Sequence, residues 1–251
     1  MGKFFNVTVK PTIVASVQNT QFGNNDVLFD WKEFDLPKGG SRLNTVTAMV
    51  RGEDGAATSN PQHLHFFFAK SINGVAPPSL GTANDTADGI GYFNHIIGAS
   101  ILDKTDGLVD GMDFMTVFQS GNTSASNVPG GISFNTDDFS TATANGYERY
   151  YVAAIHHGGN GLNFTTGVLL NQAGHQAAAT VATTLTTSGT HATKVFAIGD
   201  VIVTADGEAV GTVTAVGGTT SITVDAVAEA FVHTDELLNT SPVSLVLHYE
   251  K

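Results

Sequence analysis

Apolar and polar side chains alternate with a period of two residues along most of this chain, and this pattern constrains the fold more than any other feature. It is clear at Phe4–Val9 and at residues 27–34 and 43–51. Such alternation is typical of β-strands that bury one face. No segment keeps the i, i+3, i+4, i+7 apolar spacing and the caps of an amphipathic helix over about eleven residues or more. The sequence therefore predicts an all-β protein with less than roughly 15% helix, well below the usual one third.

The first 174 residues hold eight or nine of these predicted strands. The strands are 4–9, 13–17, 27–34, 43–51, 63–70, 96–102, 112–119, 147–157 and 167–171. Polar loops rich in Gly, Ser, Thr and Asn join them, the longest at 75–90 and 121–146. This number of strands, with long loops at their ends, predicts a jelly-roll-like β-sandwich over residues 1–174, and an immunoglobulin-like sandwich is the nearest alternative.

The composition changes near residue 175. Residues 175–189 are rich in Ala and Thr and resemble a linker. Short strand patterns with Gly turns then follow at 195–198, 201–204, 210–216, 221–224 and 243–249. They predict a small SH3-like or OB-like β-barrel over residues 190–251. The last of these strands could instead return to the first domain, which would make the barrel an insertion, and the sequence leaves both arrangements open.

Charge and composition exclude several classes of protein. Only 14% of the 251 residues are charged, against about 25% in an average soluble domain, and 11 Lys and Arg face 23 Asp and Glu for a net charge of −12. So few basic residues argue against a nucleic-acid partner. No apolar run approaches the roughly 20 residues of a membrane span, and the first ten residues lack the apolar core of a signal peptide. The absence of cysteine excludes a disulfide scaffold, a Cys-ligated zinc site and a thiol nucleophile.

A surface built from Thr, Asn, Ser and Gly is common in proteins that work in assemblies. Exposed Lys and Glu side chains are costly to order at an interface, and these smaller side chains cost less. An extracellular or halotolerant β protein would show a similar composition. Composition alone therefore leaves both classes open with similar weight.

Histidines supply the first candidate for a metal site. His63 and His65 are two residues apart, so they share one face of a strand, whereas His156 and His157 are adjacent and face opposite sides. Two imidazoles on one face can begin a Zn²⁺ site, but a third ligand is needed and nothing in the sequence places His95 nearby. The favoured interpretation is that these histidines are packed and hydrogen-bonded.

Acidic residues supply the second candidate for a metal site. Four aspartates surround two glycines: Asp103, Asp106, Asp110 and Asp113. Carboxylates around Gly turns suit Ca²⁺, but the EF-hand spacing is absent, so a solvated turn is favoured. We predict no metal site and no cofactor.

Enzyme motifs are missing. The chain has no Gly-x-Ser-x-Gly, no His-Glu-x-x-His and no phosphate loop. A glycosidase would need two facing carboxylates, and the candidates Asp137, Asp138 and Glu148 lie in or beside a polar loop. We therefore predict that the protein is not an enzyme and has no catalytic residues.

Aromatic residues could form a platform for sugars. The candidates are Trp31, Tyr92, Tyr147, Tyr150 and Tyr151. Tyr150 and Tyr151 are adjacent and point to opposite faces of a strand, so at most one of them joins a surface patch. Trp31 is expected in the core, because two-residue spacing places it on the same face as Phe29.

Several stretches resemble structural proteins of tailed bacteriophages, especially marine and cyanobacterial phages. The stretches are 27–39, 43–52, 65–71, 196–203, 206–217 and 220–224. The last three are similar to small β-barrel modules of such proteins. The resemblance implies a virion component, first a capsid decoration (cement) protein and second a tail or fibre-associated protein that binds a host surface glycan.

Together these observations predict a homo-oligomer that binds the major capsid protein or other virion proteins on the outer surface of the phage head. A protein that binds only the assembled shell stabilises it by mass action. We expect the loops 75–90 and 121–146 and the strand Phe4–Val9 to make the contacts. The acidic residues 190–240 are expected to face solvent.

Overall fold

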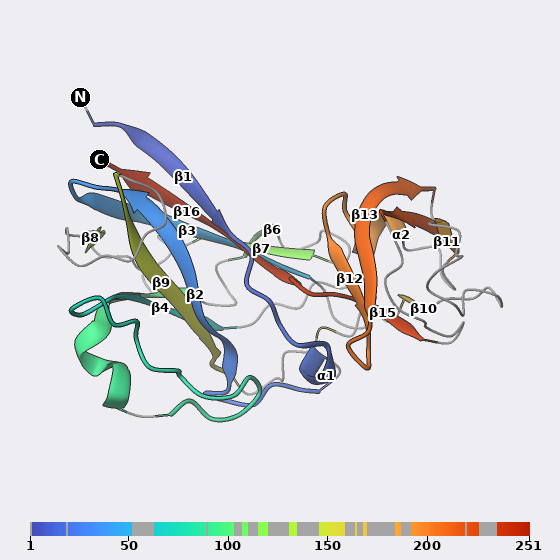
Figure 1. Ribbon diagram of the computed structural model, residues 1–251, viewed down its shortest axis with the longest axis horizontal. Helices are drawn as coiled ribbons and strands as arrows, with labels where there is room; N and C mark the ends of the chain where they lie inside the picture. The colour runs from blue at the N-terminus through green and yellow to red at the C-terminus, as the bar shows by residue number, and fades with distance from the viewer. Residues whose placement is uncertain are drawn as a thin grey trace.

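Strands make up nearly all of the ordered elements of this protein (Figure 1). The computed structural model describes residues 2–18, 20–51, 63–88, 90–102, 107–109, 115–119, 131–134, 146–158, 164, 168–169, 184–186, 192–218, 220–225 and 235–251. Helical structure in these residues is limited to α1 (Ala15–Gln18), α2 (Ala192–Val195) and the 3₁₀ helix η2 (Ile90–His95). The predicted all-β class is confirmed.

Two antiparallel sheets form a sandwich. The first sheet has the order β1 (Phe4–Val9), β16 (Val243–Glu250), β3 (Ser41–Arg51), β7 (Met115–Gln119) and β6 (Gly107–Val109), and β8 (Ile132–Phe134) also pairs with β3. The second sheet has the order β2 (Val27–Pro37), β9 (Tyr147–His156), β4 (Leu64–Lys70) and β5 (Ile96–Leu102).

The connections between these strands have the jelly-roll arrangement. The chain passes from one sheet to the other between β1, β2, β3 and β4, and later strands fill the gaps: β9 lies between β2 and β4, and β16 lies between β1 and β3. Wrapping of this kind defines the jelly roll. The immunoglobulin-like alternative has a different strand order and does not describe this sandwich.

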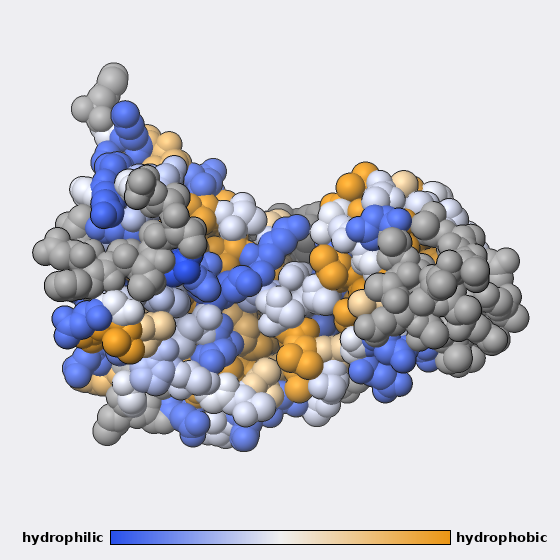
Figure 2. Space-filling model, in the orientation of Figure 1, coloured by the Kyte–Doolittle hydropathy of each residue, from blue (hydrophilic) through white to orange (hydrophobic). Residues whose placement is uncertain are grey.

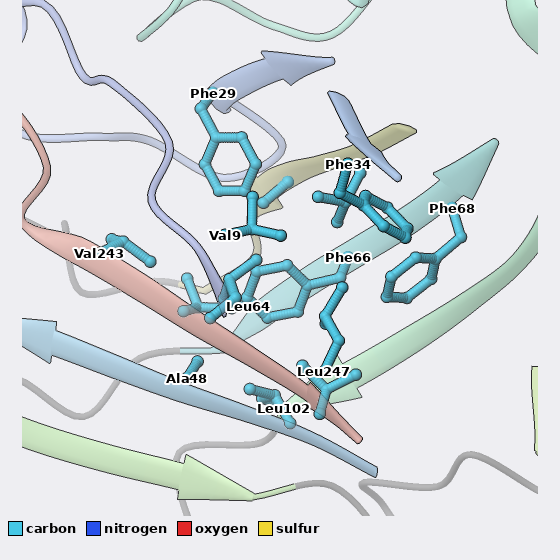
Figure 3. Close-up of a cluster of buried hydrophobic side chains, with 14 of the residues drawn as sticks. Val9, Phe29, Phe34, Ala48, Leu64, Phe66, Phe68, Leu102, Val243 and Leu247 are labelled. Carbon is cyan, nitrogen blue, oxygen red and sulfur yellow. The ribbon is translucent and has the colours of Figure 1, made fainter. Parts of the chain in front are cut away.

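The core lies between the two sheets. In β16, alternate residues from Val243 to Tyr249 are fully buried, which is the pattern of a strand with one inward face. Figure 3 shows Phe66 and Phe68 of β4 with side chains from the facing sheet, among them Leu247. Burial of these apolar side chains contributes about 25 cal/mol for each Å² removed from water.

Strand β2 departs from simple alternation. Its pairing with β9 shifts register between Val27 and Phe29 and again between Phe29 and Lys32. As a result Phe29 belongs to the sandwich core, whereas Trp31 packs with Val27 against a separate small cluster. The expectation that Phe29 and Trp31 share a face is therefore wrong, because an irregularity between them rotates the strand.

A second unit has its own sheet and core. The sheet order is β10 (Val168–Leu169), β15 (Glu236–Asn239), β12 (Val201–Thr204), β13 (Ala209–Gly217), β14 (Ser221–Val224) and β11 (Thr184–Thr186). Its core is distinct from that of the sandwich. A closed barrel needs its first and last strands to pair. Within the described residues the sheet instead ends at the short strands β10 and β11, so the predicted SH3-like or OB-like barrel is wrong.

This second unit is inserted between two strands of the sandwich. The chain leaves β9 for the second unit and comes back as β16, which pairs with both β1 and β3. Two strands also cross the expected boundaries. β10 lies inside residues 1–174 but pairs with β15, and β11 lies inside the stretch 175–189 that resembled a linker.

Two predicted strands are replaced by a short helical turn with irregular backbone beside it, α1 at 13–17 and α2 at 195–198. In the stretch 13–17, the buried Gln18 donates its side-chain amide to the carbonyl of Ile13, which closes the turn at α1. In the stretch 195–198, the Phe196 N–H donates to the Ala192 carbonyl. Val195 and Phe196 are both buried, and a strand with one inward face would expose one of them.

Specific polar contacts join the two units. Gln18 also donates to the Asn239 carbonyl at 2.8 Å, and the Ile13 N–H donates to the Thr240 carbonyl at 2.8 Å. Arg51 at the end of β3 pairs with Asp200. In the described part of the chain, no helix has the length and apolar character needed to cross a bilayer.

Candidate assembly surface

The four histidines singled out in the sequence do gather at one end of the second sheet. His65 stacks on His157 with ring centroids 4.5 Å apart, and the His157 N–H donates to the His63 carbonyl. His156 is fully buried and its Nδ1 lies 2.8 Å from the Gly23 carbonyl, so this nitrogen carries the proton. As expected for adjacent strand residues, His156 and His157 face opposite sides.

The environment of this cluster disfavours protonation. Burial, followed by the neighbouring His157 and His63, lowers the pKa of His65 to about 4. Burial is also the main reason that the pKa of His156 is lowered. His65 is therefore neutral at neutral pH and can stack on its neighbour without charge repulsion.

No metal centre is assembled from these side chains. His95 is elsewhere and its Nδ1 lies 2.9 Å from the Lys70 carbonyl. Among the residues that the structure describes, no group of three or more His, Asp or Glu side chains converges in a way that could hold a metal ion. The aspartates proposed for calcium, Asp103, Asp106, Asp110 and Asp113, lie outside the described residues.

The candidate carboxylates do not form a described pair. Glu148 is buried in β9 and accepts a hydrogen bond from the Tyr150 hydroxyl at 3.0 Å. Asp137 and Asp138 lie outside the described residues. Glu148 is thus hydrogen-bonded to a core tyrosine and is not accessible to solvent.

Most of the described aromatic candidates are buried or half-buried. Tyr150 and Tyr151 are both buried, and Trp31 donates its indole N–H to the Pro78 carbonyl at 2.7 Å. Tyr147 is the exposed member of the set, with 42% of its surface accessible. The side chain of Tyr92 lies outside the described residues. The members of the set whose side chains are described do not form a platform for a sugar ring.

The first long loop, residues 75–90, is fastened to the sandwich. The Leu80 N–H donates to Asp30 Oδ1 at 2.9 Å, and the backbone of Val27 bonds with Asn84 and Asp85. Leu80 is fully buried. In its described residues this segment covers the start of β2 and is held by the chain itself, so it is not a free arm.

The second long loop, residues 121–146, contains a core strand. β8 pairs with β3, and Phe134 is fully buried among the rings of Phe34, Phe68 and Tyr249. The expectation of one continuous surface loop is therefore wrong at residues 132–134. The apolar-polar-apolar pattern Ile132-Ser-Phe134 could have indicated a short strand, but three residues are too few for a periodicity argument.

The third expected contact element, β1, has an open side. β1 pairs with β16 along one edge and is the terminal strand of its sheet. Figure 1 shows β1 along the upper margin of the molecule, with no described element drawn beyond it. Its outward residues Phe4, Asn6 and Thr8 are exposed, and Phe4 has 75% of its surface accessible. An edge with unpaired backbone N–H and C=O groups is a template for another strand.

Other exposed apolar side chains are scattered over both units. The largest are Val14, Val75, Phe93, Ile198 and Val201. Figure 2 shows hydrophobic residues in separate areas of this face, interspersed with hydrophilic ones. We therefore take β1, with its flanking residues, as the candidate assembly surface.

Comparisons with known proteins add little to this geometry. No protein-family model matches the chain, and no curated protein sequence matches it. Among solved structures, the crystal structure of the infectious bursal disease virus VP2 subviral particle shares 10% identity over 99% of this chain and 41% of that chain, with a TM-score of 0.20. The structure of the infectious bursal disease virus Gx strain shares 10% identity over 100% and 40%, with a TM-score of 0.16. The chain thus spans about two fifths of each, and at these scores neither comparison informs the function.

Proposed function

We propose that this chain is a structural protein of a virus particle, and specifically a capsid decoration protein that binds the outer surface of a tailed-phage head. The observation that carries the proposal is a complete jelly-roll sandwich whose first sheet ends in an open, uncharged edge strand. Because an exposed edge invites association with other chains, natural proteins that act alone usually protect it. Here Phe4–Val9 carries no charge, proline or glycine that would protect the edge.

The surface chemistry supports the same role. A chain with 14% charged residues presents mainly Thr, Asn, Ser and Gly to its surroundings, which lowers the entropic cost of an interface. The sequence stretches that resemble phage structural proteins lie in both units, for example 43–52, which overlaps β3, and 206–217 around β13. The expected partners are the major capsid protein and further copies of this chain.

In this role the protein acts by binding. Each copy that binds only the assembled shell stabilises it, by about 2.7 kcal/mol per site when the free concentration is about 100 times the Kd. The inserted unit, which Figure 1 shows beyond one end of the sandwich, would face solvent. The glycan-binding alternative gains no support from the aromatic residues, because Tyr150 and Tyr151 are buried.

The test locates the chain on particles. Virions that carry its gene are purified, and an antibody raised against the protein is applied to intact particles and viewed by electron microscopy. Label spread over the heads supports the proposal. Label confined to tails favours the fibre alternative, and particles that lack the chain contradict both.

A second measurement tests the mechanism. Heads depleted of the protein are heated with and without added purified protein, and release of packaged DNA is recorded. The proposal expects release at a higher temperature with the protein present. The same release temperature at saturating protein contradicts a stabilising role.

A further inference from the structure

The backbone hydrogen bonds of β1 show which groups its free edge offers. The N–H of Lys3 donates to the carbonyl of Lys251 and the N–H of Lys251 donates to the carbonyl of Lys3, both at 2.9 Å. In an antiparallel pair, residues alternate between those bonded to the partner strand and those whose N–H and C=O face away. Since the register with β16 continues without a shift, Phe4, Asn6 and Thr8 direct their backbone groups out of the sheet.

This edge is complementary to itself. If a second copy of β1 runs antiparallel about a two-fold axis at Asn6, Asn6 faces Asn6 of the second copy and Phe4 faces Thr8 of the second copy. In this register every outward N–H and C=O of these three residues meets an outward group of the other strand. A shift by one residue would oppose outward groups to groups already bonded to β16, so such a register is excluded.

Side chains on both faces of β1 suit the same register. On the inner face, Phe5 and Val7 are half-buried against the sandwich core, and Phe5 would face Val7 of the second copy. The two cores would then be continuous through the joined sheets. On the outer face, the exposed ring of Phe4 would pack beside Thr8 of the second copy, a cross-strand contact that also removes apolar surface from water.

Charged side chains at the two ends of β1 are also complementary in this register. The Glu250 carboxylate reaches over Gly2: a Cβ atom placed on Gly2 would lie 2.6 Å from Glu250 Oε1. Gly2 is the position that faces Lys10 of the second copy, and Lys10 is exposed on the same outer face. Each Lys10 ammonium would therefore approach the Glu250 carboxylate of the other copy, which gives two symmetric ion pairs.

We infer that the chain forms a two-fold dimer by antiparallel pairing of β1 with β1 of a second copy, centred on Asn6. The inference rests on the proposed assembly role and names the occupant of the edge. It is tested on the isolated full chain, whereas the particle assignment is tested on virions, so the failure of one is distinguishable from the failure of the other.

Single cysteines test the register, because the chain contains none of its own. Facing residues of a hydrogen-bonded pair have Cα atoms about 5.5 Å apart, which is within the range that a disulfide spans. Asn6→Cys should therefore form a covalent dimer on mild oxidation. Thr8→Cys is the matched control: it lies on the same exposed face, but the two copies of residue 8 would be about 13 Å apart, four strand residues at roughly 3.3 Å each.

A mixture of two cysteine variants gives a positive test of the same register. Phe4→Cys and Thr8→Cys face each other in the proposed register, so their mixture should cross-link more than either variant alone. If Asn6→Cys stays monomeric on oxidation, or if Thr8→Cys alone cross-links as readily, the proposed pairing is wrong.

Charge reversal tests the ion pairs independently of any cross-link. Lys10→Glu and Glu250→Lys should each raise the dimer dissociation constant about tenfold, because each places like charges at both ends of the interface. The double variant K10E/E250K should restore the dissociation constant of the unchanged protein. Sedimentation equilibrium measures the constants, and circular dichroism checks that each variant is folded. An unchanged constant in the single variants, or no recovery in the double variant, overturns the proposed register.

Discussion

Arg51 and Asp200 form the ion pair that connects the sandwich to the inserted unit, with Arg51 Nη2 2.5 Å from Asp200 Oδ2. Asp200 is buried, and the same oxygen accepts the Ala197 N–H at 2.8 Å. The pair therefore fixes the turn before β12 and the end of β3 at the same time. Burial lowers the pKa of Arg51, and the nearby Asp200 carboxylate opposes this effect.

Removal of this ion pair is the first prediction. Arg51→Ala should lower the free energy of unfolding by about 1–3 kcal/mol, since it leaves the Asp200 carboxylate buried with one fewer donor. Chemical denaturation measures the loss. The double variant R51A/D200N should be less destabilised than the sum of the single variants, because no buried charge is left unpaired. Strict additivity of the two substitutions would contradict a direct interaction.

Two buried tyrosines allow a matched comparison, which is the second prediction. The Tyr249 hydroxyl has no hydrogen-bond partner among the described residues, whereas Tyr150 donates to Glu148 at 3.0 Å. Tyr249→Phe should therefore leave stability unchanged or raise it by up to about 1 kcal/mol, and Tyr150→Phe should lower it by about 1.5–3 kcal/mol. Thermal unfolding of the two variants checks this order, and the reverse order would contradict it.

The histidine cluster leads to a prediction about pH. Burial and the neighbouring histidines lower the pKa of His65 to about 4 in the folded protein, from 6.5. The unfolded chain therefore binds a proton at this position between pH 6.5 and about 4 when the folded protein does not. The stability contributed by neutral His65 is fully present above pH 6.5 and is lost as the pH falls toward 4.

His65→Gln should flatten this fall in stability, as measured by melting temperature across pH 4 to 7. The companion variant His157→Gln removes the stacked ring. It should raise the pKa of His65 and reduce the fall without abolishing it. If His65→Gln keeps the pH profile of the unchanged protein, His65 is not the source of the dependence.

Close packing between β5 and β8 provides the fourth prediction. A Cβ atom on Gly98 would lie 2.7 Å from Ile132 Cγ2, whereas a Cβ on Gly91 would meet only Pro78 at 3.8 Å. Gly98→Ala should therefore lower stability by about 1–3 kcal/mol through overpacking, and Gly91→Ala should change it by less than about 0.5 kcal/mol. Denaturation midpoints compare the two. The double variant G98A/I132A, which removes the Ile132 Cγ1, Cγ2 and Cδ1 atoms, should be less destabilised than the sum of the two single variants. An equal effect of Gly98→Ala and Gly91→Ala would contradict the packing of β8 on β5.

Period-two alternation alone was enough to predict most strands of the sandwich. Residues 43–51 and 243–249 form strands within β3 and β16. The alternation of apolar and polar residues that gives a strand one buried face is a local property of the sequence. The same reasoning was wrong at residues 13–17, where the Gln18 amide closes a helical turn through bonds that include a carbonyl 221 residues away. It was also wrong between Phe29 and Trp31, because a register shift leaves no mark in the spacing of apolar residues.

The sequence by itself determined the all-β class, the low charge and the uncharged strand Phe4–Val9, because these properties depend on residue type and local spacing. Only the tertiary structure decided that β16 returns between β1 and β3, that Phe134 enters the core and that β1 remains at the edge. It also decided that the Glu250 carboxylate lies over Gly2, near one end of the proposed interface. Strand pairing joins residues at any separation along the chain through backbone groups that every residue carries, so the choice of neighbour depends on the packing of the whole molecule.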